Sequence, residues 1–245
     1  MSNCYLPYCK CCTVRKNGLI HSGKQKYECL SCRKQFVEDP QNKIIPDDTK
    51  ERIRRSLLER VSLEGICRIF DVSMPWLLGF MEKVFQSLPD DLNATIVAEN
   101  DEFEVAVLEG DEMWSFVGSK DNDQWLCLVM HSATRQILPF HIGKRNKASG
   151  EALMKKLPDD LKKKANFYTD KFSVYYEIIP WLQHSAVSKK SGKTSYIERF
   201  NCTIRQRCSR LVRKALSFSK KLENHIGLIK MFICDYNKNL KSLHV

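Results

Sequence analysis

The chain has 245 residues, of which 43% are hydrophobic, enough to build one large domain or several small ones. Its 40 basic residues outnumber its 29 acidic residues, and the net charge of +11 favours a polyanionic partner, nucleic acid first. A membrane span is excluded because no run of 18 apolar residues occurs, and the start "MSNCYLPYCKCC" lacks the apolar segment of a signal peptide, so we expect an intracellular protein.

Cysteine is concentrated at the N-terminus, where six of the eleven cysteines fall in the first 32 residues. The segment "ECLSC" places Cys29 and Cys32 at the C-x2-C spacing that presents two thiolates to one tetrahedral zinc ion. Residues 1–40 contain few apolar residues, so a metal would supply their folding energy, and the surrounding bases favour a ribbon that also contacts DNA. We therefore predict a ribbon with one structural Zn²⁺. The first two zinc ligands are either Cys9 and Cys12 or Cys4 and Cys9, and the sequence does not decide between these pairs.

After a linker at 40–48, the pattern from 49 to 88 is helical and broken by one short turn. Ser62 and Ser73 are expected to cap two helices, and Pro75 suits a first helical turn. The apolar residues expected to face the core are Leu63, Ile66, Ile69, Phe70, Leu77, Leu78 and Met81. This is the pattern of a helix-turn-helix that reads DNA, and the alternative is a plain helical hairpin used for dimerisation.

A second polar junction at 89–95 leads into alternating strand-like and helical runs. Predicted strands cover 103–118, 124–132, 135–143 and 165–170. Predicted helices cover 147–157, 172–179, 195–216 and 222–240. Three strands that read as antiparallel, followed by mixed strands and helices, indicate an α/β domain.

Acidic residues are concentrated between Glu99 and Glu112, a stretch that holds seven acids and no base. Because side chains alternate across a strand, Asp111 and Glu112 are expected to face opposite ways and not to share one site. Asp170 ends another predicted strand, where α/β sheets place ligand-binding side chains. With Glu198 on a helix, Asp111 and Asp170 form the oxygen ligand set that two Mg²⁺ ions need for phosphoryl transfer, and Mn²⁺ is an alternative.

The helix that carries Glu198 is otherwise basic. Its apolar stripe is predicted to pack on the core and comprises Ile197, Phe200, Ile204, Cys208, Leu211 and Ala215. We expect the bases around the rest of the helix to hold the DNA backbone beside the metal ions. These predicted DNA-binding residues are Arg199, Arg205, Arg207, Arg210, Arg213 and Lys214.

Three motifs, "GDEMWSFVGSK…QWL", "FYTDKFSVYYEIIP" and "TSYIERFNCTIRQRCSRLVRKALSFSKKLENHIG", resemble transposases of the bacterial insertion sequence one family. "VRKNG…GKQKYECLSCRKQF" resembles the zinc finger that precedes the helix-turn-helix in that family. The resemblance implies a catalytic domain of ribonuclease H-like fold, a mixed sheet flanked by helices, with Asp111, Asp170 and Glu198 as its Asp–Asp–Glu triad. It also implies three domains: a zinc ribbon at 1–40, a helix-turn-helix at 47–90 and the catalytic domain at 100–245. The departure lies at the opening cysteine pair, where the family spacing to "KNG" makes Cys9 the second cysteine.

The function implied is a DNA transposase that binds terminal inverted repeats of double-stranded DNA, cleaves the ends of its element and joins the 3′ ends to target DNA. Cutting two ends together requires a homodimer or a higher homo-oligomer. A protein of this kind is expected in the cytoplasm, associated with the nucleoid. Two alternatives are a catalytically silent DNA-binding regulator and a structure-specific nuclease of the same fold.

Overall fold

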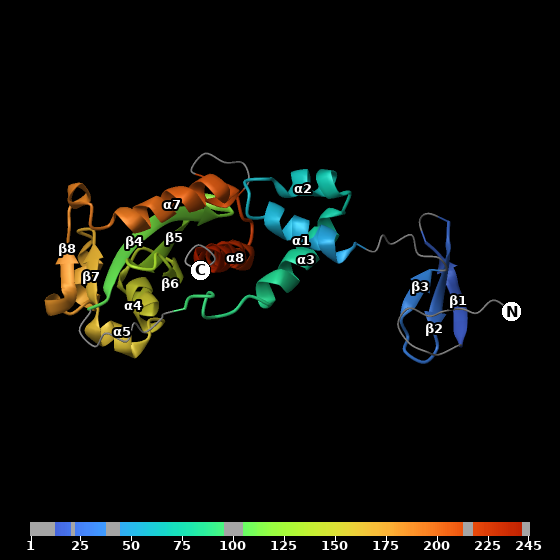
Figure 1. The fold of residues 1–245 in the computed structure, drawn as a ribbon. Coiled ribbons are helices and arrows are strands. Elements are labelled where there is room, and N and C mark those ends of the chain that lie inside the picture. The colour runs from blue at the N-terminus through green and yellow to red at the C-terminus, as the bar shows by residue number, and fades with distance from the viewer. Residues whose placement is uncertain (1–12, 21–22, 38–44, 96–104, 213–217, 242–245) are drawn as a thin grey trace. The chain divides into compact units, whose positions relative to one another are not determined.

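The computed structural model describes residues 13–20, 23–37, 45–95, 105–212 and 218–241 (Figure 1). Contacts within the chain divide it into two compact units, residues 1–47 and residues 48–245. Each helix in the described ranges is too short or too polar to cross a lipid bilayer. The predicted domain boundaries at 40, 47, 90 and 100 stay predictions. The further division between the helical segment and the α/β domain stays a prediction.

The first unit contains a small antiparallel sheet in the order β1-β2-β3. The strands are β1 (Val14–Leu19), β2 (Gln25–Cys29) and β3 (Gln35–Val37). The rings of Tyr27 and Phe36 stack across β2 and β3, with centroids 5.8 Å apart. A sheet this small, with one such aromatic pair, has little apolar area to bury, and its stabilisation by a metal stays a prediction.

The second unit begins with the helices α1 (Asp47–Ser56), α2 (Leu63–Phe70) and α3 (Met74–Gln86). Both predicted caps are confirmed: the Ser62 hydroxyl accepts from the backbone N–H of Gly65, and the Ser73 hydroxyl accepts from that of Trp76. Two breaks interrupt the segment rather than the one expected, because α1 ends at Ser56.

The prediction of which residues on these helices face the core is only partly right. Ile66, Leu77 and Met81 are fully buried. Ile69 is 65% exposed and Leu78 is 41% exposed, so the prediction that they face the core is wrong. A helix as short as α2 presents a narrow inward stripe, and this stripe centres on Ile66.

The α/β domain is built on a mixed sheet of five strands in the order β6-β5-β4-β7-β8. The antiparallel part consists of β4 (Val107–Val117), β5 (Ser119–His131) and β6 (Ile137–Gly143). The strands β7 (Asn166–Thr169) and β8 (His184–Ala186) run parallel to β4. This arrangement is the mixed, helix-flanked sheet expected of a ribonuclease H-like domain. The sequence pattern missed β8, which has only three residues.

Helices cover both faces of the sheet (Figure 1). On one face, α4 (Lys147–Lys155) and α6 (Ser173–Ile178) pack near a core that includes Leu108, Leu153 and Phe167. On the other face, α7 (Ser195–Arg207) lies along β4 and β5. The short α5 (Asp159–Lys164), also missed by the sequence pattern, precedes β7.

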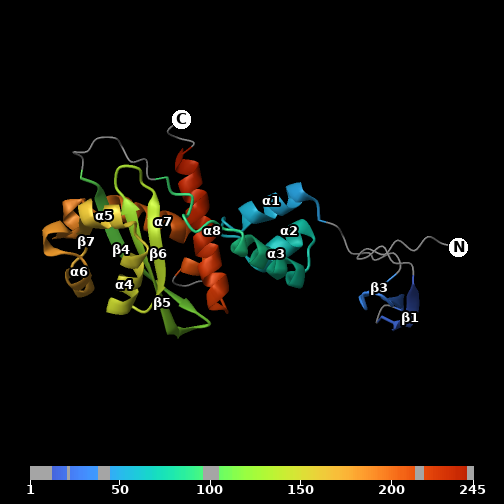
Figure 2. The same cartoon turned by 90° about the horizontal axis from the view of Figure 1, so that it is seen from below.

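The long C-terminal helix α8 (Leu222–Lys241) lies between the sheet and the helices α1–α3 (Figure 2). Asn237 is fully buried on α8, where its Nδ2 donates to the carbonyls of Leu92 and Ile137 and its Oδ1 accepts from the N–H of Ile137. Lys230 donates to the Leu88 carbonyl and pairs with Asp90 at 2.7 Å. Through α8, the polar junction after α3 is therefore fastened to the α/β domain.

The predicted helix over 195–216 is corrected, because α7 ends at Arg207. Cys208 has an extended backbone and is followed by a single 3-10 turn, Ser209–Leu211. The chain then returns to the end of β4, where the N–H of Gly118 donates to the Ser219 carbonyl at 2.8 Å. The predicted stripe residues Ile197, Phe200 and Ile204 are buried on α7, and Cys208 and Leu211 are buried beyond its end. The five described residues of the stripe are therefore buried as predicted, two of them outside the helix, and Ala215 lies outside the described residues.

Candidate active site

Asp111 and Asp170 lie side by side at one edge of the sheet. Parallel pairing aligns β4 with β7, and the last paired residues are Gly110 and Thr169. Asp111 follows the first and Asp170 follows the second, so both carboxylates lie where β7 ends. A Cβ on Gly110 would lie 3.2 Å from the Thr169 side chain, so glycine allows this close pairing. Asp170 follows the end of its strand as expected, and it meets Asp111 in the middle of β4.

Glu112 joins them, which corrects the expectation that it faces away. One carboxylate oxygen from each of Asp111, Glu112 and Asp170 lies within 4.8 Å of the other two. Alternation does send Asp111 and Glu112 toward opposite faces of β4. Beyond Gly110, however, β7 no longer pairs with this edge, so two long side chains can bend around it toward the same point.

Helix α7 is attached to β4 by two acidic residues of that strand. Glu109 is buried, and its Oε2 accepts from the backbone N–H groups of Tyr196 and Ile197 at 3.1 and 3.0 Å. These N–H groups belong to the first turn of α7, where a carboxylate satisfies otherwise unpaired donors and interacts favourably with the helix dipole. Asp111 accepts a hydrogen bond from Asn201 Nδ2 at 2.7 Å. The sequence reading missed both contacts, although the spacing of Glu109 and Asp111 puts them on one face of β4.

Glu198 lies in the first turn of α7, three residues before Asn201. Its Oε1 accepts from the Thr194 hydroxyl at 3.0 Å. Its charge is among the smaller causes that raise the pKa of Asp111, so the two carboxylates lie within electrostatic range of each other. Among the described residues, the cluster of carboxylates within 4.8 Å does not include Glu198.

Burial governs the electrostatics of the cluster. Together with the charge of Asp170, it raises the pKa of Asp111 to about 6. Burial also raises the pKa of Glu112 to about 7, again with a contribution from Asp170. Acids packed together in a poorly solvated place resist ionising together unless a cation is added.

The donor set fits a hard divalent cation. Carboxylate oxygens are the ligands that Mg²⁺ and Mn²⁺ prefer, and opposite oxygens around Mg²⁺ lie about 4.2 Å apart. Asn201 supports the fit, because its buried Oδ1 has no hydrogen-bond partner while its Nδ2 is bound to Asp111. A carbonyl oxygen of this kind suits an ion or a water molecule held by an ion.

The predicted DNA-binding residues of the basic helix separate into different groups. Arg199 is exposed on α7, and Arg205 is partly buried. Arg207 pairs with Glu59 at 2.7 Å and lies over the ring of Phe232, so it holds the helical segment against the α/β domain. Arg213 and Lys214 lie outside the described residues.

The prediction that Arg210 binds DNA is corrected by the structure. Arg210 is 9% exposed, and its guanidinium donates to the Ser219 hydroxyl at 2.8 Å. Burial lowers its pKa. Because α7 stops before it, Arg210 enters the interior instead of continuing the exposed basic face, and it cannot hold a phosphate there.

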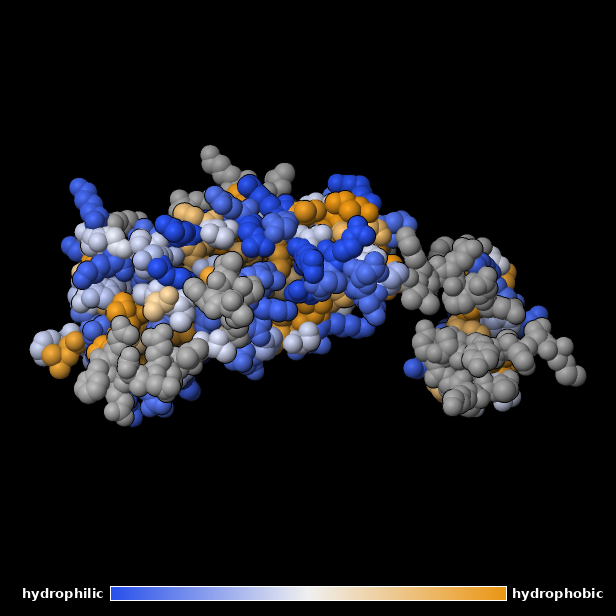
Figure 3. All heavy atoms as spheres, in the orientation of Figure 1, coloured by the Kyte–Doolittle hydropathy of each residue, from blue (hydrophilic) through white to orange (hydrophobic). Residues whose placement is uncertain are grey.

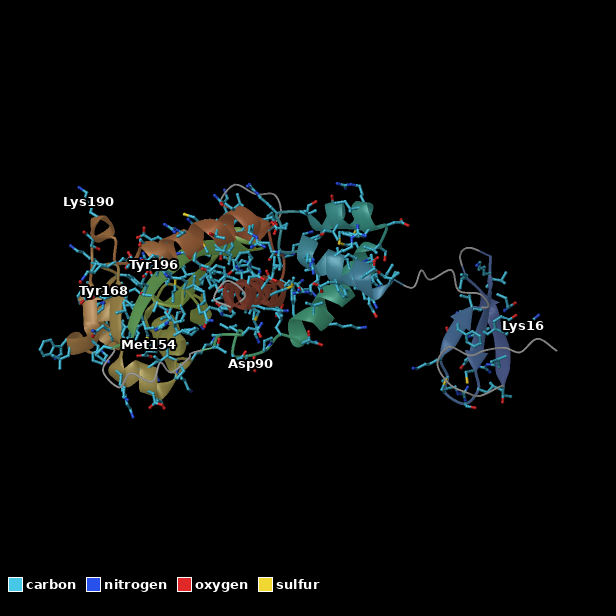
Figure 4. All side chains as sticks on the ribbon, in the orientation of Figure 1. Lys16, Asp90, Met154, Tyr168, Lys190 and Tyr196 are labelled. Carbon is cyan, nitrogen blue, oxygen red and sulfur yellow. The ribbon has the colours of Figure 1, made fainter. Side chains whose placement is uncertain are left out.

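Other bases, which the sequence reading did not single out, lie next to Asp170 in the chain or in the loop before α7. Lys171 follows Asp170 directly and is exposed. Lys193, in the loop before α7, places its Nζ 4.7 Å from the ring centroid of Tyr168 on β7. Figure 4 shows Lys190 projecting outward from this same end of the molecule, where Tyr168 and Tyr196 also lie. The basic run "VSKKSGK" in the sequence is the signal that could have predicted bases in this loop.

Arg145 is the base in direct contact with the cluster. Its guanidinium lies 3.3 Å from Glu112 Oε2 and over the rings of Trp125 and Phe172. Hydrophilic residues, with hydrophobic ones between them, cover much of the face of residues 48–245 seen in Figure 3. The cluster is therefore bordered by cations that could approach a polyanion.

Part of the predicted zinc site lies in the described residues. Cys29 is buried at the end of β2, and Cys32 lies in the turn that follows. The backbone N–H of Cys32 points toward Cys29 Sγ at 3.5 Å. Cys4, Cys9 and Cys12 lie outside the described residues, so the zinc ligands and the opening pair stay predictions.

Comparison with known proteins identifies relatives of the region that contains this site. The model of the IS1 transposase family matches residues 105–238, more than half of the chain. Insertion element IS1 protein InsB of Shigella sonnei is 33% identical over 130 residues, which are 53% of this chain and 95% of that protein. Insertion element IS1 9 protein InsB of Escherichia coli K12 is also 33% identical over 130 residues, covering 74% of its length. The matched region contains the whole carboxylate cluster and α7, and the chain therefore belongs to the IS1 transposase family.

Proposed function

We propose that Asp111, Asp170 and Glu198 hold two Mg²⁺ ions, which Mn²⁺ can replace, and that this transposase works by metal-dependent phosphoryl transfer. The observation that supports the proposal is the meeting of Asp111 and Asp170 at the sheet edge, beside the helix that carries Glu198. Ions held there would activate the attacking oxygen and offset the charge of the phosphate in transit.

The chain's own groups would orient the reaction. Asn201 Nδ2 donates to Asp111 Oδ2 and so would restrict the orientation of that carboxylate. Water attacks the phosphodiester at the end of the element, and the cleaved bond releases a 3′-hydroxyl. That hydroxyl then attacks a target phosphodiester, forming a new bond and releasing the target's own 3′-oxygen. No covalent bond between enzyme and DNA is needed.

DNA would be held by the exposed bases around the cluster, chiefly Lys171, Lys193 and Arg199. They sit on loops and a helix face, where contacts to phosphate position the substrate without reading its sequence. We propose that the helices α2 and α3 and the zinc-bound first unit recognise the terminal inverted repeats. Cleavage of both ends would take place in a homodimer or a higher homo-oligomer.

The test is strand cleavage and strand transfer by Asp111→Asn, Asp170→Asn and Glu198→Gln. Each change keeps the shape of the side chain and removes a charge that binds the metal, so activity should fall to background while DNA affinity is retained. Glu177→Gln, which removes an exposed acid paired with Lys147 at 3.1 Å, is the control and should stay active. If one of the three variants transfers strands at a rate close to wild type, that residue is not a ligand.

A further inference from the structure

Glu112 is a residue of the cluster to which the proposed mechanism gives no role. Its side chain is only 3% exposed, yet it ends within 4.8 Å of the carboxylate oxygens of Asp111 and Asp170. Burying a third acid next to two others is costly unless a cation compensates for it. The placement therefore needs a reason beyond the packing of the strand.

A buried polar atom beside the cluster points to a bound ligand. Asn201 is 7% exposed, and its Oδ1 has no hydrogen-bond partner among the described residues. Its Nδ2 donates to Asp111. The Tyr175 hydroxyl, by contrast, lies against β4 and interacts with Glu112. Buried polar atoms normally find partners, so Asn201 Oδ1 favours a hydrated ion in the cluster.

Arg145 is the cation that now faces Glu112. The distance of 3.3 Å between the guanidinium and Oε2 is long for an ion pair, and the side chain of Arg145 is 37% exposed. One guanidinium at the rim compensates only part of the charge of three acids. A divalent ion between the carboxylates would compensate for more of it at shorter range.

We propose that Glu112 is a further carboxylate ligand of the metal site, so that β4 supplies two consecutive ligands around its open edge. This rests on the proposed metal-dependent function and extends its ligand set to Asp111, Glu112 and Asp170, with Glu198 approaching from α7. Arg145 is then a competitor that pairs with Glu112 until a metal ion binds.

The test is a titration of Mn²⁺ into metal-free protein, followed by calorimetry or by the loss of the free Mn²⁺ resonance signal. Both measurements report binding without DNA cleavage. Glu112→Gln should weaken Mn²⁺ affinity by at least about tenfold. Glu177→Gln removes the same charge from an exposed position and should bind Mn²⁺ like wild type. Unchanged affinity in Glu112→Gln would overturn the assignment.

Glu112→Asp is a second variant that keeps the charge and the possible pair with Arg145. It withdraws the carboxylate by one methylene, so a ligand role predicts weaker Mn²⁺ binding here too. Wild-type affinity in this variant would show that only nearby charge matters, and the ligand assignment would be wrong.

Arg145→Gln adds a test of the competition. It should tighten Mn²⁺ binding in the wild-type background and have little effect in the Glu112→Gln background, because the competitor acts through that carboxylate. Equal tightening in both backgrounds would indicate a general charge effect and contradict the proposal.

The fate of the proposed function is judged separately. If the Asp111→Asn and Asp170→Asn variants still transfer strands, the proposed metal site itself is wrong. If those variants are inactive while Glu112→Gln binds Mn²⁺ normally, only the assignment of Glu112 fails.

Discussion

Asn201 shows how one side chain can fix the orientation of a neighbouring carboxylate, that of Asp111. Its Nδ2 donates to Asp111 at 2.7 Å, and because a carboxylate only accepts, the amide must present its Oδ1 elsewhere. That oxygen is buried and has no partner. Asn201 therefore acts as a positioning residue, which restricts Asp111 and leaves an acceptor ready for metal-bound water.

We predict that Asn201→Ala weakens both Mn²⁺ affinity and DNA cleavage by about tenfold to a hundredfold, the range typical of residues that orient a metal ligand. Asp111 would lose the donor that restricts its carboxylate. Gln206→Ala, which removes an exposed amide from the same helix, is the control for Mn²⁺ binding. Mn²⁺ affinity equal to wild type in Asn201→Ala would contradict the positioning role.

At the scale of elements, α8 is joined to β4 by a buried polar network. His225 on α8 is fully buried, with its Nε2 3.0 Å from the Ser115 hydroxyl and its Nδ1 3.3 Å from the Ser219 hydroxyl. Arg210 donates to the same Ser219 hydroxyl. The network explains why the chain leaves the helical path after Arg207, since Arg210 and Ser219 must meet inside.

Burial, together with the charge of Arg210, lowers the pKa of His225 from 6.5 to about 4. A lowered pKa means that the folded protein resists protonation, so this histidine contributes stability above pH 6.5 that is lost as the pH falls toward 4. The loss amounts to about 3 kcal/mol. We predict that the free energy of unfolding of wild type falls more steeply between pH 6.5 and 4 than that of His225→Asn.

Urea unfolding of both proteins at several pH values in this window measures the difference. Carboxyl groups elsewhere titrate in both proteins and cancel in the comparison. Parallel pH profiles for wild type and variant would show that His225 does not titrate in the predicted window.

At the scale of the whole molecule, the helical segment and the α/β domain meet through α3 and α8. Gly227 on α8 is buried against Phe85 of α3, and a Cβ there would clash with the ring. Contact this close is possible only without a side chain. Lys230, Asn237 and the ion pair of Arg207 with Glu59 add polar contacts between the two parts.

Gly227→Ala should therefore force α3 and α8 apart and lower the free energy of unfolding by about 1–3 kcal/mol. Gly79→Ala is the matched control, because Gly79 on α3 has open space around it and alanine there should stabilise the helix by about 0.5–1 kcal/mol. Thermal and urea unfolding measure both changes. If Gly227→Ala is as stable as wild type, α3 and α8 can separate without cost.

The separation of the chain into two units leads to a prediction about zinc. Because residues 1–47 form a unit of their own, Cys29→Ser should lose the zinc ion and unfold that unit while the unfolding transition of 48–245 is retained. Metal content per chain and limited proteolysis check this, and Cys202→Ser on α7 is the thiol control. Cys4→Ser and Cys12→Ser, measured separately, decide the opening pair. Wild-type protein without stoichiometric zinc would contradict the site.

Local patterns were sufficient for the features that depend on a few neighbouring residues. Ser62 and Ser73 cap their helices as predicted, because a cap depends on the residues that follow it within one turn. The position of Asp170 at the end of a strand could be expected as well, since it directly follows a short run of strand-forming residues.

Tertiary structure decided what depends on neighbours distant in the sequence. Alternation along β4 predicted that Glu112 faces away, but the end of β7 leaves an open edge around which it turns toward Asp111. Helical periodicity continued past Arg207, but burial of Arg210 against Ser219 ended the helix there. Periodicity records which residues are buried, whereas the path of the chain depends on the partners that bury them.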